Sequence, residues 1–418
     1  MSHETLLNRG LDYYKPTMSQ HHFEHNPDTE VTFTFKNRGE QRLADYLTVE
    51  DLQARFDAIQ ERGFTDDELD YYAELKHPDG TAAFSTNYLN YLRGNELPRV
   101  NVAFNEDQDD IAMTATGDAP LVTFWETVIM SEVNEMYFEN YLVKHNVDPA
   151  ALYAEGDRRL TQKIEQLRER PDIKFSEFGT RRHFSYKWQR YVTNRLRREC
   201  PDNFVGTSNV ALSEEIGYQP IGTFAHEMPM IYAGIADAKS EDIRQSHNQF
   251  LQDWRNQYGD NLNVALTDTF GTDFFFEDFT PEQAREWNAL RHDSGDPIEF
   301  GEKTIAFYKA NGIDPATKTI VFSDGLNLDK IIELQDHFGG RINTTYGWGT
   351  TLTNDLGIKP LNIVMKATHV TLPNGAEADL VKLSDNKGKH TGPEAQIKRY
   401  QTIFAATGKL AAKDVVVC

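Results

Sequence analysis

A histidine beside a glutamate marks the stretch of this sequence with the clearest capacity for chemistry. Residues 221–232 read as a short strand, then the pair His226-Glu227, then an apolar helix that starts near Pro229. Proline is favoured in the first turn of a helix, and α/β folds place their reactive groups where a strand ends and a helix begins. Taken alone, a histidine in this position is more often a capping or buried structural residue. The other strand ends of the chain therefore decide between these interpretations.

Polar and glycine residues recur after the other predicted strands. In chain order they are Arg181 and Arg182, Thr207 and Ser208, Asp268, Arg291 with Asp293, Ser294 and Asp296, Gly325, and Gly347 with Gly349 and Thr350. In a parallel barrel all strands end at one face, so these side chains would share one pocket. Each residue alone could be an ordinary turn or helix cap, but together they indicate a common site.

Three kinds of chemistry follow from these residue types. Glycine turns at helix N-termini, at Gly325 and at residues 347–350, expose backbone N–H groups that suit a phosphate. Arginine offers a fork of donors for oxyanions. Asp293 and Asp296 are spaced to accept hydrogen bonds from a polyol such as ribose, or to hold a magnesium ion. The sequence therefore predicts an enzyme that binds phosphate and ribose.

The elements that position these residues alternate between strand and helix from residue 173 onward. Apolar or alternating runs occur at 174–178, 203–206, 220–224, 263–266, 289–292, 319–322, 342–346 and 362–365. Repeated strand–helix units imply a mainly parallel sheet, and eight of them suggest a (β/α) barrel, with a doubly wound open sheet as the alternative. The earlier residues predict mixed α+β packing, with strands at 31–35, 113–117 and 120–124. Neither a Rossmann glycine fingerprint nor a Walker loop follows any of these runs.

Composition limits the functional class. The 418 residues carry a net charge of −22, which argues against a nucleic-acid binder and against attachment to an anionic membrane. An anionic substrate would need a cationic site built locally against this charge. Cys200 and Cys418 are too few for a disulfide framework or a zinc site, and no long apolar segment or signal peptide is apparent. We expect a cytoplasmic protein.

Four separated motifs resemble the nicotinate phosphoribosyltransferase family. They are Asp12-Tyr13-Tyr14-Lys15, Glu177-Phe178-Gly179-Thr180-Arg181-Arg182, Gly222-Thr223-Phe224-Ala225-His226-Glu227, and Arg291-His292-Asp293-Ser294-Gly295-Asp296, and the similarity continues to Lys382-Leu383-Ser384-Asp385. The resemblance implies the type II phosphoribosyltransferase fold. We expect an α+β domain at residues 1–135, an irregular α/β barrel at 136–367, and a C-terminal segment at 368–418 that packs on the N-terminal domain.

The resemblance also implies a reaction and a set of catalytic residues. Members of the family convert nicotinate and phosphoribosyl pyrophosphate to nicotinate mononucleotide and pyrophosphate in NAD salvage, coupled to hydrolysis of ATP, with Mg²⁺ as the expected ion. The matching histidine is transiently phosphorylated by ATP, which would make His226 a phosphohistidine. We expect His226, Glu227, Arg291 and Asp293 to be catalytic, with Asp293 on the ribose hydroxyls and Arg291 on the phosphates.

The substrate-binding residues follow from the same resemblance. Phe178 and Tyr14 would stack on the two faces of the pyridine ring, and in the family the tyrosine comes from the neighbouring subunit, which implies a homodimer with active sites at the interface. The remaining expected contacts with substrate are Arg181, Thr207, Ser208, Asp268, Ser294, Gly325, Gly347, Gly349 and Thr350.

Ser208 bears on the choice of base. Relatives that use nicotinamide have an aspartate at the matching position, whereas a serine can donate a hydrogen bond to the carboxylate of nicotinate. The alternatives of the same fold are a nicotinamide or a quinolinate phosphoribosyltransferase, and the more distant one is a barrel-shaped binding protein or lyase. His292 and Ser323-Asp324-Gly325 depart from the usual family pattern and leave the phosphate contacts at those turns open.

Overall fold

The computed structural model describes residues 7–407, and these residues form two compact units. Unit 1 holds the chain up to Gly222 together with Trp348–Lys366, and unit 2 holds Thr223–Gly347 together with the chain from Ala367 onward. The chain therefore leaves unit 1 after Gly222, returns at Trp348 and leaves again after Lys366. The domain boundaries expected from the sequence stay predictions, and Cys418 lies outside the described residues.

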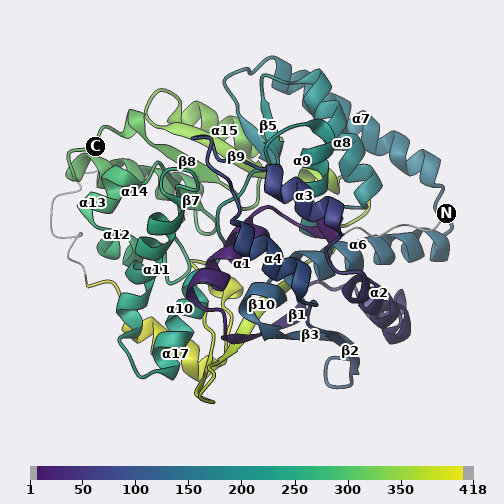
Figure 1. The fold of residues 1–418 in the computed structure, drawn as a ribbon. Helices are drawn as coiled ribbons and strands as arrows, with labels where there is room; N and C mark the ends of the chain where they lie inside the picture. Colours follow the sequence, from purple (N-terminus) through teal and green to yellow (C-terminus); the bar gives the residue numbers. More distant parts are fainter. Residues whose placement is uncertain (1–6, 408–418) are drawn as a thin grey trace. The chain divides into compact units, whose positions relative to one another are not determined.

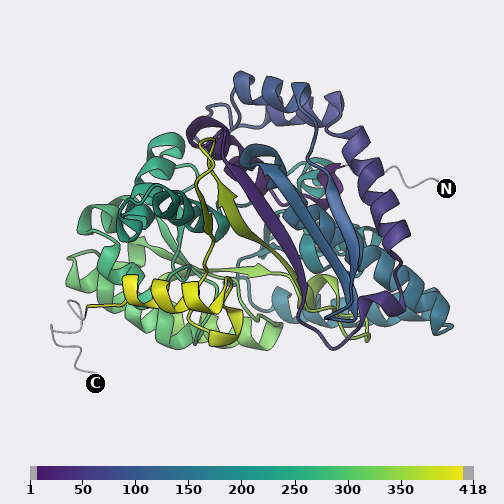
Figure 2. The same ribbon diagram turned by 90° about the horizontal axis from the view of Figure 1, so that it is seen from below.

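Unit 1 contains antiparallel strands with a buried face. β3 (Asp110–Asp118) pairs with β1 (Glu30–Asn37) and with β2 (Val100–Asn105), and Figure 2 shows these strands side by side as long purple and blue arrows. Alternate residues of β1 are buried, as expected of a strand with one face in the core. The predicted strands at 31–35 and 113–117 lie in β1 and β3, which confirms them.

The helices of unit 1 begin at residues whose side chains cap the backbone. Thr48, Thr65 and Ser85 each accept a hydrogen bond from the N–H three residues later, which satisfies an otherwise unpaired donor. The main helices are α1 (Tyr14–His25), α2 (Val49–Arg62), α3 (Asp66–Glu74), α4 (Thr86–Gly94), α6 (Trp125–Lys144), α7 (Pro149–Arg168), α8 (Tyr186–Glu199) and α9 (Val210–Ile216).

A parallel pair in unit 1 positions several expected site residues. β4 (Phe175–Glu177) pairs with β5 (Phe204–Thr207), and α8 connects them. The short helix η3 (Thr180–Arg182) follows β4, and α9 follows β5. The first βα repeat predicted from the sequence is therefore confirmed.

Unit 2 is built around four parallel strands. β6 (Val264–Leu266), β7 (Ala289–His292), β8 (Thr319–Phe322) and β9 (Asn343–Trp348) lie next to one another in this order. Figure 1 shows β7, β8 and β9 among the helices of this unit. The helices are α10 (Glu227–Ala238), α11 (Ile243–Tyr258), α12 (Thr272–Asp278), α13 (Pro281–Glu286), α14 (Pro297–Ala310), α15 (Leu328–Phe338) and α17 (Glu394–Ile403).

An aromatic cluster ties the C-terminal segment into unit 2. Phe270 and Phe404 stack with their ring centroids 3.9 Å apart, and Phe274, Leu383 and Tyr400 pack around them. Burial of such large apolar side chains stabilises the segment by about 1.5–3 kcal/mol per side chain.

The predicted strands at 220–224 and 120–124 are wrong, and the one at 362–365 is a strand with an antiparallel partner. Residues 220–224 form no strand; Pro220 lacks an N–H donor, and a Cβ on Gly222 would lie 2.9 Å from the backbone nitrogen of Tyr14. The run at 362–365 belongs to β10 (Ile363–Thr371), which pairs antiparallel with β11 (Glu377–Asp379) and is not a further βα strand. The run at 120–124 begins in the short helix α5 (Ala119–Val122).

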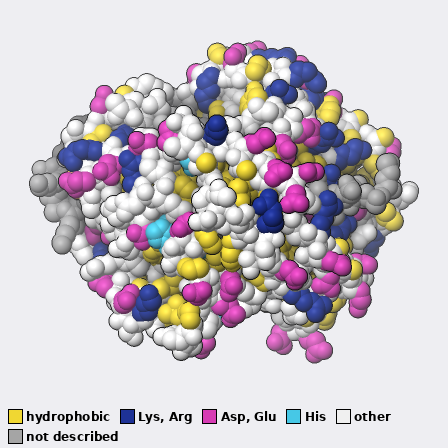
Figure 3. Space-filling view, in the orientation of Figure 1, with side chains coloured by type: hydrophobic (Ala, Val, Ile, Leu, Met, Phe, Trp, Pro, Cys, Tyr) yellow, Lys and Arg dark blue, Asp and Glu magenta, His cyan; other side chains and the backbone are white. Residues whose placement is uncertain are grey.

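Two further features of the structure are the apolar length of its helices and the distribution of charge on one face of its surface. No helix among residues 7–407 is both long and apolar enough to cross a membrane. Figure 3 shows Lys and Arg side chains interspersed with Asp and Glu side chains over one face, so the excess negative charge does not form a single acidic patch on that face.

Candidate active site

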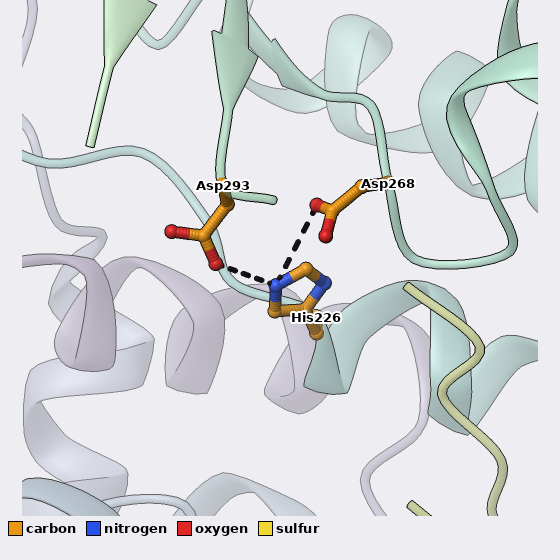
Figure 4. A group of neighbouring side chains, drawn as sticks. All are labelled: His226, Asp268 and Asp293. Atoms are coloured by element: carbon orange, nitrogen blue, oxygen red, sulfur yellow. Dashed lines mark hydrogen bonds and ion pairs between the residues drawn. The ribbon is translucent and has the colours of Figure 1, made fainter. Parts of the chain in front are cut away.

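The ends of β6 and β7 bring two carboxylates to His226 in unit 2. His226 directly precedes α10, Asp268 follows β6, and Asp293 follows β7. His226 Nε2 lies 2.8 Å from Asp293 Oδ2 and 3.7 Å from Asp268 Oδ1, and its Nδ1 lies 3.0 Å from the hydroxyl oxygen of Thr269. Figure 4 shows both carboxylates pointing at the same edge of the ring. The sequence predicted this convergence but assigned nothing to Thr269.

The charges of this group follow from its burial and its neighbours. Burial lowers the pKa of His226, and Lys382 lowers it further, while Asp268 and Asp293 act in the opposite direction. Burial opposes ionisation of Asp293, but Arg291 and His226 outweigh it and hold its pKa well below the usual range. His226 is therefore neutral and Asp293 ionised near neutral pH. The Nε2–H then donates to Asp293, and the Nδ1 lone pair accepts from Thr269.

Arg291 is fixed at the end of β7 by three partners. Its Nε donates to Ser323 Oγ over 2.8 Å, its Nη2 lies 3.4 Å from Asp293 Oδ1, and its Nη1 donates to the Phe224 carbonyl over 3.5 Å. Ser323 Oγ also donates toward Asp293 Oδ1 over 3.1 Å. This guanidinium therefore adds positive charge beside Asp293 and holds the carboxylate in one orientation.

Asp268 is held by two serines from different segments of unit 2. The hydroxyl of Ser294 donates to Asp268 Oδ2 over 2.5 Å and that of Ser384 over 3.2 Å, and the two serine oxygens lie 2.9 Å apart. Ser384 has φ of 58°, a left-handed conformation that is uncommon outside glycine and concentrates at functional sites. The sequence predicted Ser294 and missed Ser384, although the motif at 382–385 pointed to this segment.

A cation would fit between the two carboxylates. Asp268 Oδ1 is buried and accepts no hydrogen bond from the part of the chain that the structure describes. One donor atom from each of His226, Asp268 and Asp293 lies within 4.8 Å of the others. Magnesium prefers carboxylate oxygens and water, so Asp268 and Asp293 are the suitable ligands of this group.

The remaining expected residues of unit 2 lie at strand or helix ends. Gly325 has φ of 62° in the turn after β8, and Lys389 Nζ reaches Asp324 Oδ1 in that turn over 2.6 Å. Gly347 lies in β9 and Glu227 is the buried first residue of α10. Asp296 accepts hydrogen bonds from the N–H groups of residues 298 and 299 and is the N-cap of α14, so the capping interpretation explains it.

A second group of expected residues gathers in unit 1 around Arg181. The Arg181 guanidinium lies 5.5 Å from the centre of the Tyr14 ring, and its Nε lies 3.3 Å from Asp12 Oδ2. Ser208 donates its hydroxyl proton to Asp12 Oδ1 over 2.6 Å, while the Tyr13 N–H donates to the Ser208 carbonyl over 2.7 Å. The N-terminal segment of this chain is thus fixed against the turn after β5. The roles of Tyr14 and Ser208 toward a base stay predictions.

Phe178 and the Gly349 turn meet in the same unit. The Phe178 N–H donates to the Trp348 carbonyl over 2.9 Å, and a Cβ on Gly349 would lie 3.0 Å from the Phe178 carbonyl oxygen. A side chain at 349 would press on this carbonyl oxygen, which a glycine avoids. Thr350 begins the short helix α16 (Thr350–Thr353), and Thr207 ends β5.

Comparisons with known proteins agree with these features. The model of the nicotinate phosphoribosyltransferase (NAPRTase) family matches residues 173–407, and the model of the NAPRTase N-terminal domain matches residues 10–134. A crystal structure of nicotinate phosphoribosyltransferase from Porphyromonas gingivalis has a TM-score of 0.86 and 31% identity, covering 96% of this chain and 99% of that one. The enzyme from Vibrio cholerae has a TM-score of 0.83 and 29% identity, covering 96% of this chain and 93% of that one. The fold class expected from the sequence is confirmed.

Proposed function

The chain belongs to the nicotinate phosphoribosyltransferase family, and we propose that ATP drives its reaction through phosphorylation of His226. The enzyme transfers the phosphoribosyl group of phosphoribosyl pyrophosphate to nicotinate, giving nicotinate mononucleotide and pyrophosphate in NAD salvage. The phosphohistidine, the use of ATP and Mg²⁺, and the residue roles below are the proposal.

The contact between His226 and Asp293 carries the proposal. With Nε2–H held by an ionised carboxylate over 2.8 Å, the lone pair on Nδ1 is the nucleophile. Nδ1 attacks the γ-phosphorus of ATP, the bond to the bridging oxygen breaks, and ADP leaves. Water later attacks the phosphohistidine and releases inorganic phosphate, which returns the neutral ring. Asp293 stabilises the positive charge on the imidazole during the transfer.

The phosphoribosyl step relies on positioning and charge. The bond from C1 of ribose to pyrophosphate breaks as the pyridine nitrogen attacks, through a state in which the sugar carries positive charge. The ionised Asp293 and Asp268 accept hydrogen bonds from the ribose hydroxyls and stabilise that charge. When bound by these carboxylates, Mg²⁺ would neutralise the departing pyrophosphate. The glycine turns at Gly325 and Gly349 offer backbone N–H groups to the phosphates.

Residues of unit 1 bind the base. Arg181 offers a guanidinium to the carboxylate of nicotinate, and Tyr14 and Phe178 offer aromatic faces to its ring. In this proposal Arg181 contributes to the local cationic site that an anionic substrate needs in so acidic a protein. We also propose that the enzyme is a cytoplasmic homodimer in which Tyr14 of one copy completes the site of the other.

Product formation tests the function. Purified protein is incubated with phosphoribosyl pyrophosphate, Mg-ATP and one of nicotinate, nicotinamide or quinolinate, and the mononucleotide is measured by mass spectrometry. We expect product with nicotinate at a rate at least tenfold above the other bases. Faster product with nicotinamide would overturn the base assignment, and no product with any base would overturn the function.

A further inference from the structure

Glu177, at the end of β4, is a buried carboxylate whose hydrogen-bond partners are neutral. Its side chain is 0% exposed. Its carboxylate accepts from the Gly179 N–H, from the Thr207 hydroxyl over 2.6 Å, and from Gln189 Nε2 over 3.0 Å. Burying a charge against neutral donors alone opposes ionisation. A buried carboxylate of this kind calls for a role beyond packing.

The three donors belong to the segments that carry the proposed base contacts. Gly179 lies between Phe178 and Arg181 in the loop after β4, Thr207 precedes Ser208 at the end of β5, and Gln189 lies in α8. The Ser208 N–H also donates to the Glu177 carbonyl over 2.9 Å. One carboxylate therefore joins both base-binding turns to each other and to a helix behind them.

The loop leaves no room for adjustment around this carboxylate. A Cβ on Gly179 would lie 2.6 Å from Glu177 Oε1 and 2.0 Å from Thr353 Oγ1. The backbone at Gly179 is thus clamped between the carboxylate and α16. Displacing the carboxylate would therefore release the backbone on both sides of Gly179.

The hydrogen bonds behind Gln189 all run toward the carboxylate. Ser131 Oγ lies 3.3 Å from His183 Nε2, and His183 Nδ1 lies 2.7 Å from Gln189 Oε1. Because Gln189 presents its oxygen to His183, its amide N–H groups face Glu177 Oε2 and Thr180 Oγ1. The ionised carboxylate accepts all three of its hydrogen bonds, whereas a protonated Glu177 must lose one of them or make the Thr207 hydroxyl turn to accept. Ionisation therefore keeps the network as it stands, and protonation rearranges it.

We propose that Glu177 is a positioning residue for the base: its ionised carboxylate holds the Phe178–Arg181 loop and the Ser208 turn in the geometry that binds nicotinate, and protonation loosens that geometry. This inference rests on the proposed function of these residues as the base site. Its consequence is that nicotinate affinity depends on the state of a side chain that never touches the base.

The charge state of Glu177 is poised to change near neutral pH. The pKa of Glu177 is raised to about 7, and burial is the largest cause. Asp12 also raises this pKa, while the hydrogen bonds from Thr207, Gln189 and Gly179 lower it in part. The charged group that acts on it is Asp12 before α1, and the titratable His183 reaches it through Gln189. The contacts from α8 and β5 are the neutral side chains of Gln189 and Thr207. Because the folded pKa is raised, this group's contribution to the free energy of unfolding is full below pH 4.5 and is lost as pH rises through about 7.

Steady-state kinetics of Glu177→Gln across pH 6 to 8.5 tests the proposal. The amide keeps the shape but cannot accept all three hydrogen bonds. We expect the wild-type KM for nicotinate to rise as pH falls through about 7, and the variant to have a KM at least tenfold higher at pH 8 without that pH dependence. The KM for phosphoribosyl pyrophosphate should change less than twofold. A variant with the wild-type nicotinate KM and pH profile would overturn the proposal.

Two further variants separate positioning from general damage. Glu132→Gln is the matched control, because burial also raises the pKa of Glu132 to about 7 but its carboxylate is bound by Arg55 of α2 over 2.9 Å. It should leave the nicotinate KM and its pH profile unchanged, and an equal effect of both variants would overturn the proposal. If Glu177→Gln fails to fold, Gln189→Met is the substitute, because it removes one hydrogen-bond donor to Glu177. The pH midpoint of the nicotinate KM should then move upward, and an unmoved midpoint would overturn the proposal. Failure of the wild type to make any mononucleotide would contradict the function instead.

Discussion

At the scale of single residues, the two nitrogens of His226 have different partners and hence different chemistry. Nε2 faces Asp293 over 2.8 Å, whereas Nδ1 faces the hydroxyl of Thr269 over 3.0 Å. A hydroxyl can turn away and free the lone pair, while an ionised carboxylate holds the opposite N–H in place. We therefore expect phosphate on Nδ1.

Replacement of His226 should separate the two halves of the reaction. His226→Asn should abolish transfer of labelled γ-phosphate from ATP to the protein and abolish ATP stimulation, while slow ATP-independent formation of mononucleotide remains. Acid-labile label and phosphorus NMR identify the modified nitrogen in the wild type. His337→Asn is the control, since His337 is exposed and pairs with Glu302. Undiminished labelling of His226→Asn would remove His226 from the mechanism.

Ser208 should tolerate loss of its hydroxyl better than gain of a charge. Ser208→Ala loses one hydrogen bond to Asp12, which costs about 1 kcal/mol, or about fivefold in KM. The Ser208 hydroxyl lies 2.6 Å from Asp12 Oδ1, so Ser208→Asp would place a second buried carboxylate beside Asp12. The new carboxylate would also face the carboxylate of nicotinate with like charge. We expect this change to cost about 3–5 kcal/mol.

Kinetics of both variants with nicotinate and nicotinamide measure this difference. Ser208→Asn, which is neutral and can donate, is the size-matched control and should resemble Ser208→Ala. Circular dichroism shows whether each variant folds. Equal losses for the Asp and Ala variants, with no gain toward nicotinamide, would show that discrimination lies elsewhere.

At the scale of elements, the loop after β4 depends on the absence of a side chain at Gly179. Gly179→Ala would force a methyl group against Thr353 Oγ1 and Glu177 Oε1, and overpacking of this kind costs about 1–3 kcal/mol. We expect the free energy of unfolding to fall by that amount and the KM for nicotinate to rise at least tenfold. Gly94→Ala is the control, because a methyl group on this last residue of α4 would have no atom within 4 Å among the described residues.

The unfolding free energies and nicotinate KM values of Gly179→Ala and Gly94→Ala test this expectation. Urea denaturation gives the free energies, and Gly94→Ala should change them by less than about 1 kcal/mol. If Gly179→Ala matched Gly94→Ala in both stability and KM, the clamp around residue 179 would not hold the base loop.

The sequence predicted elements well where one periodic pattern determined them. The runs at 174–178, 203–206 and 289–292 are strands β4, β5 and β7, because short apolar segments between helices have few other ways to bury their side chains. Residues 220–224 also carry apolar side chains but form no strand, because Pro220 lacks an N–H donor and Gly222 lies against the backbone of Tyr14. That contact joins residues far apart in the chain, and local pattern cannot reveal it.

The site was predicted to a similar extent and for the same reason. Asp268, Asp293 and Arg291 stand at the ends of β6 and β7, so the parallel arrangement was enough to bring them together. His226 precedes α10 without a strand before it, so the sequence found the residue but not the element that places it. Glu177 opens one of the family motifs but was given no role, because by itself it reads as an ordinary strand residue. Its importance depends on Gln189, 12 residues later, and on Thr207, 30 residues later, and hydrogen bonds across such separations follow only from the folded chain.

At the scale of the whole molecule, an active site needs two copies of the chain if its Tyr14 comes from the partner subunit, and one copy if Tyr14 comes from the same chain. Within one chain, the Tyr14 ring lies 5.5 Å from the Arg181 guanidinium, and we propose that it also serves the site of a partner. Mixing Tyr14→Ala with Asp293→Ala subunits should then restore about a quarter of wild-type activity at equal mixing. The reason is that about half of the dimers are mixed, and each mixed dimer of a two-fold assembly contains one site with neither lesion.

Subunit exchange is verified separately by mixing differently tagged wild-type chains and recovering both tags together by affinity purification. Wild-type chains mixed with Asp293→Ala chains serve as the activity control. Exchange without recovery of activity would show that Tyr14 acts within its own chain.

The coupling of ATP hydrolysis to formation of nicotinate mononucleotide is the most direct measurement. Purified wild-type enzyme and His226→Asn are each given nicotinate, phosphoribosyl pyrophosphate and Mg²⁺, with and without ATP, and mononucleotide and inorganic phosphate are followed together. We predict that ATP accelerates mononucleotide formation by the wild type and that phosphate appears in step with product, whereas His226→Asn forms product slowly and releases no phosphate from ATP. Product formation by the wild type that is unaffected by ATP, or phosphate release that persists in His226→Asn, would contradict an ATP-driven transfer through His226.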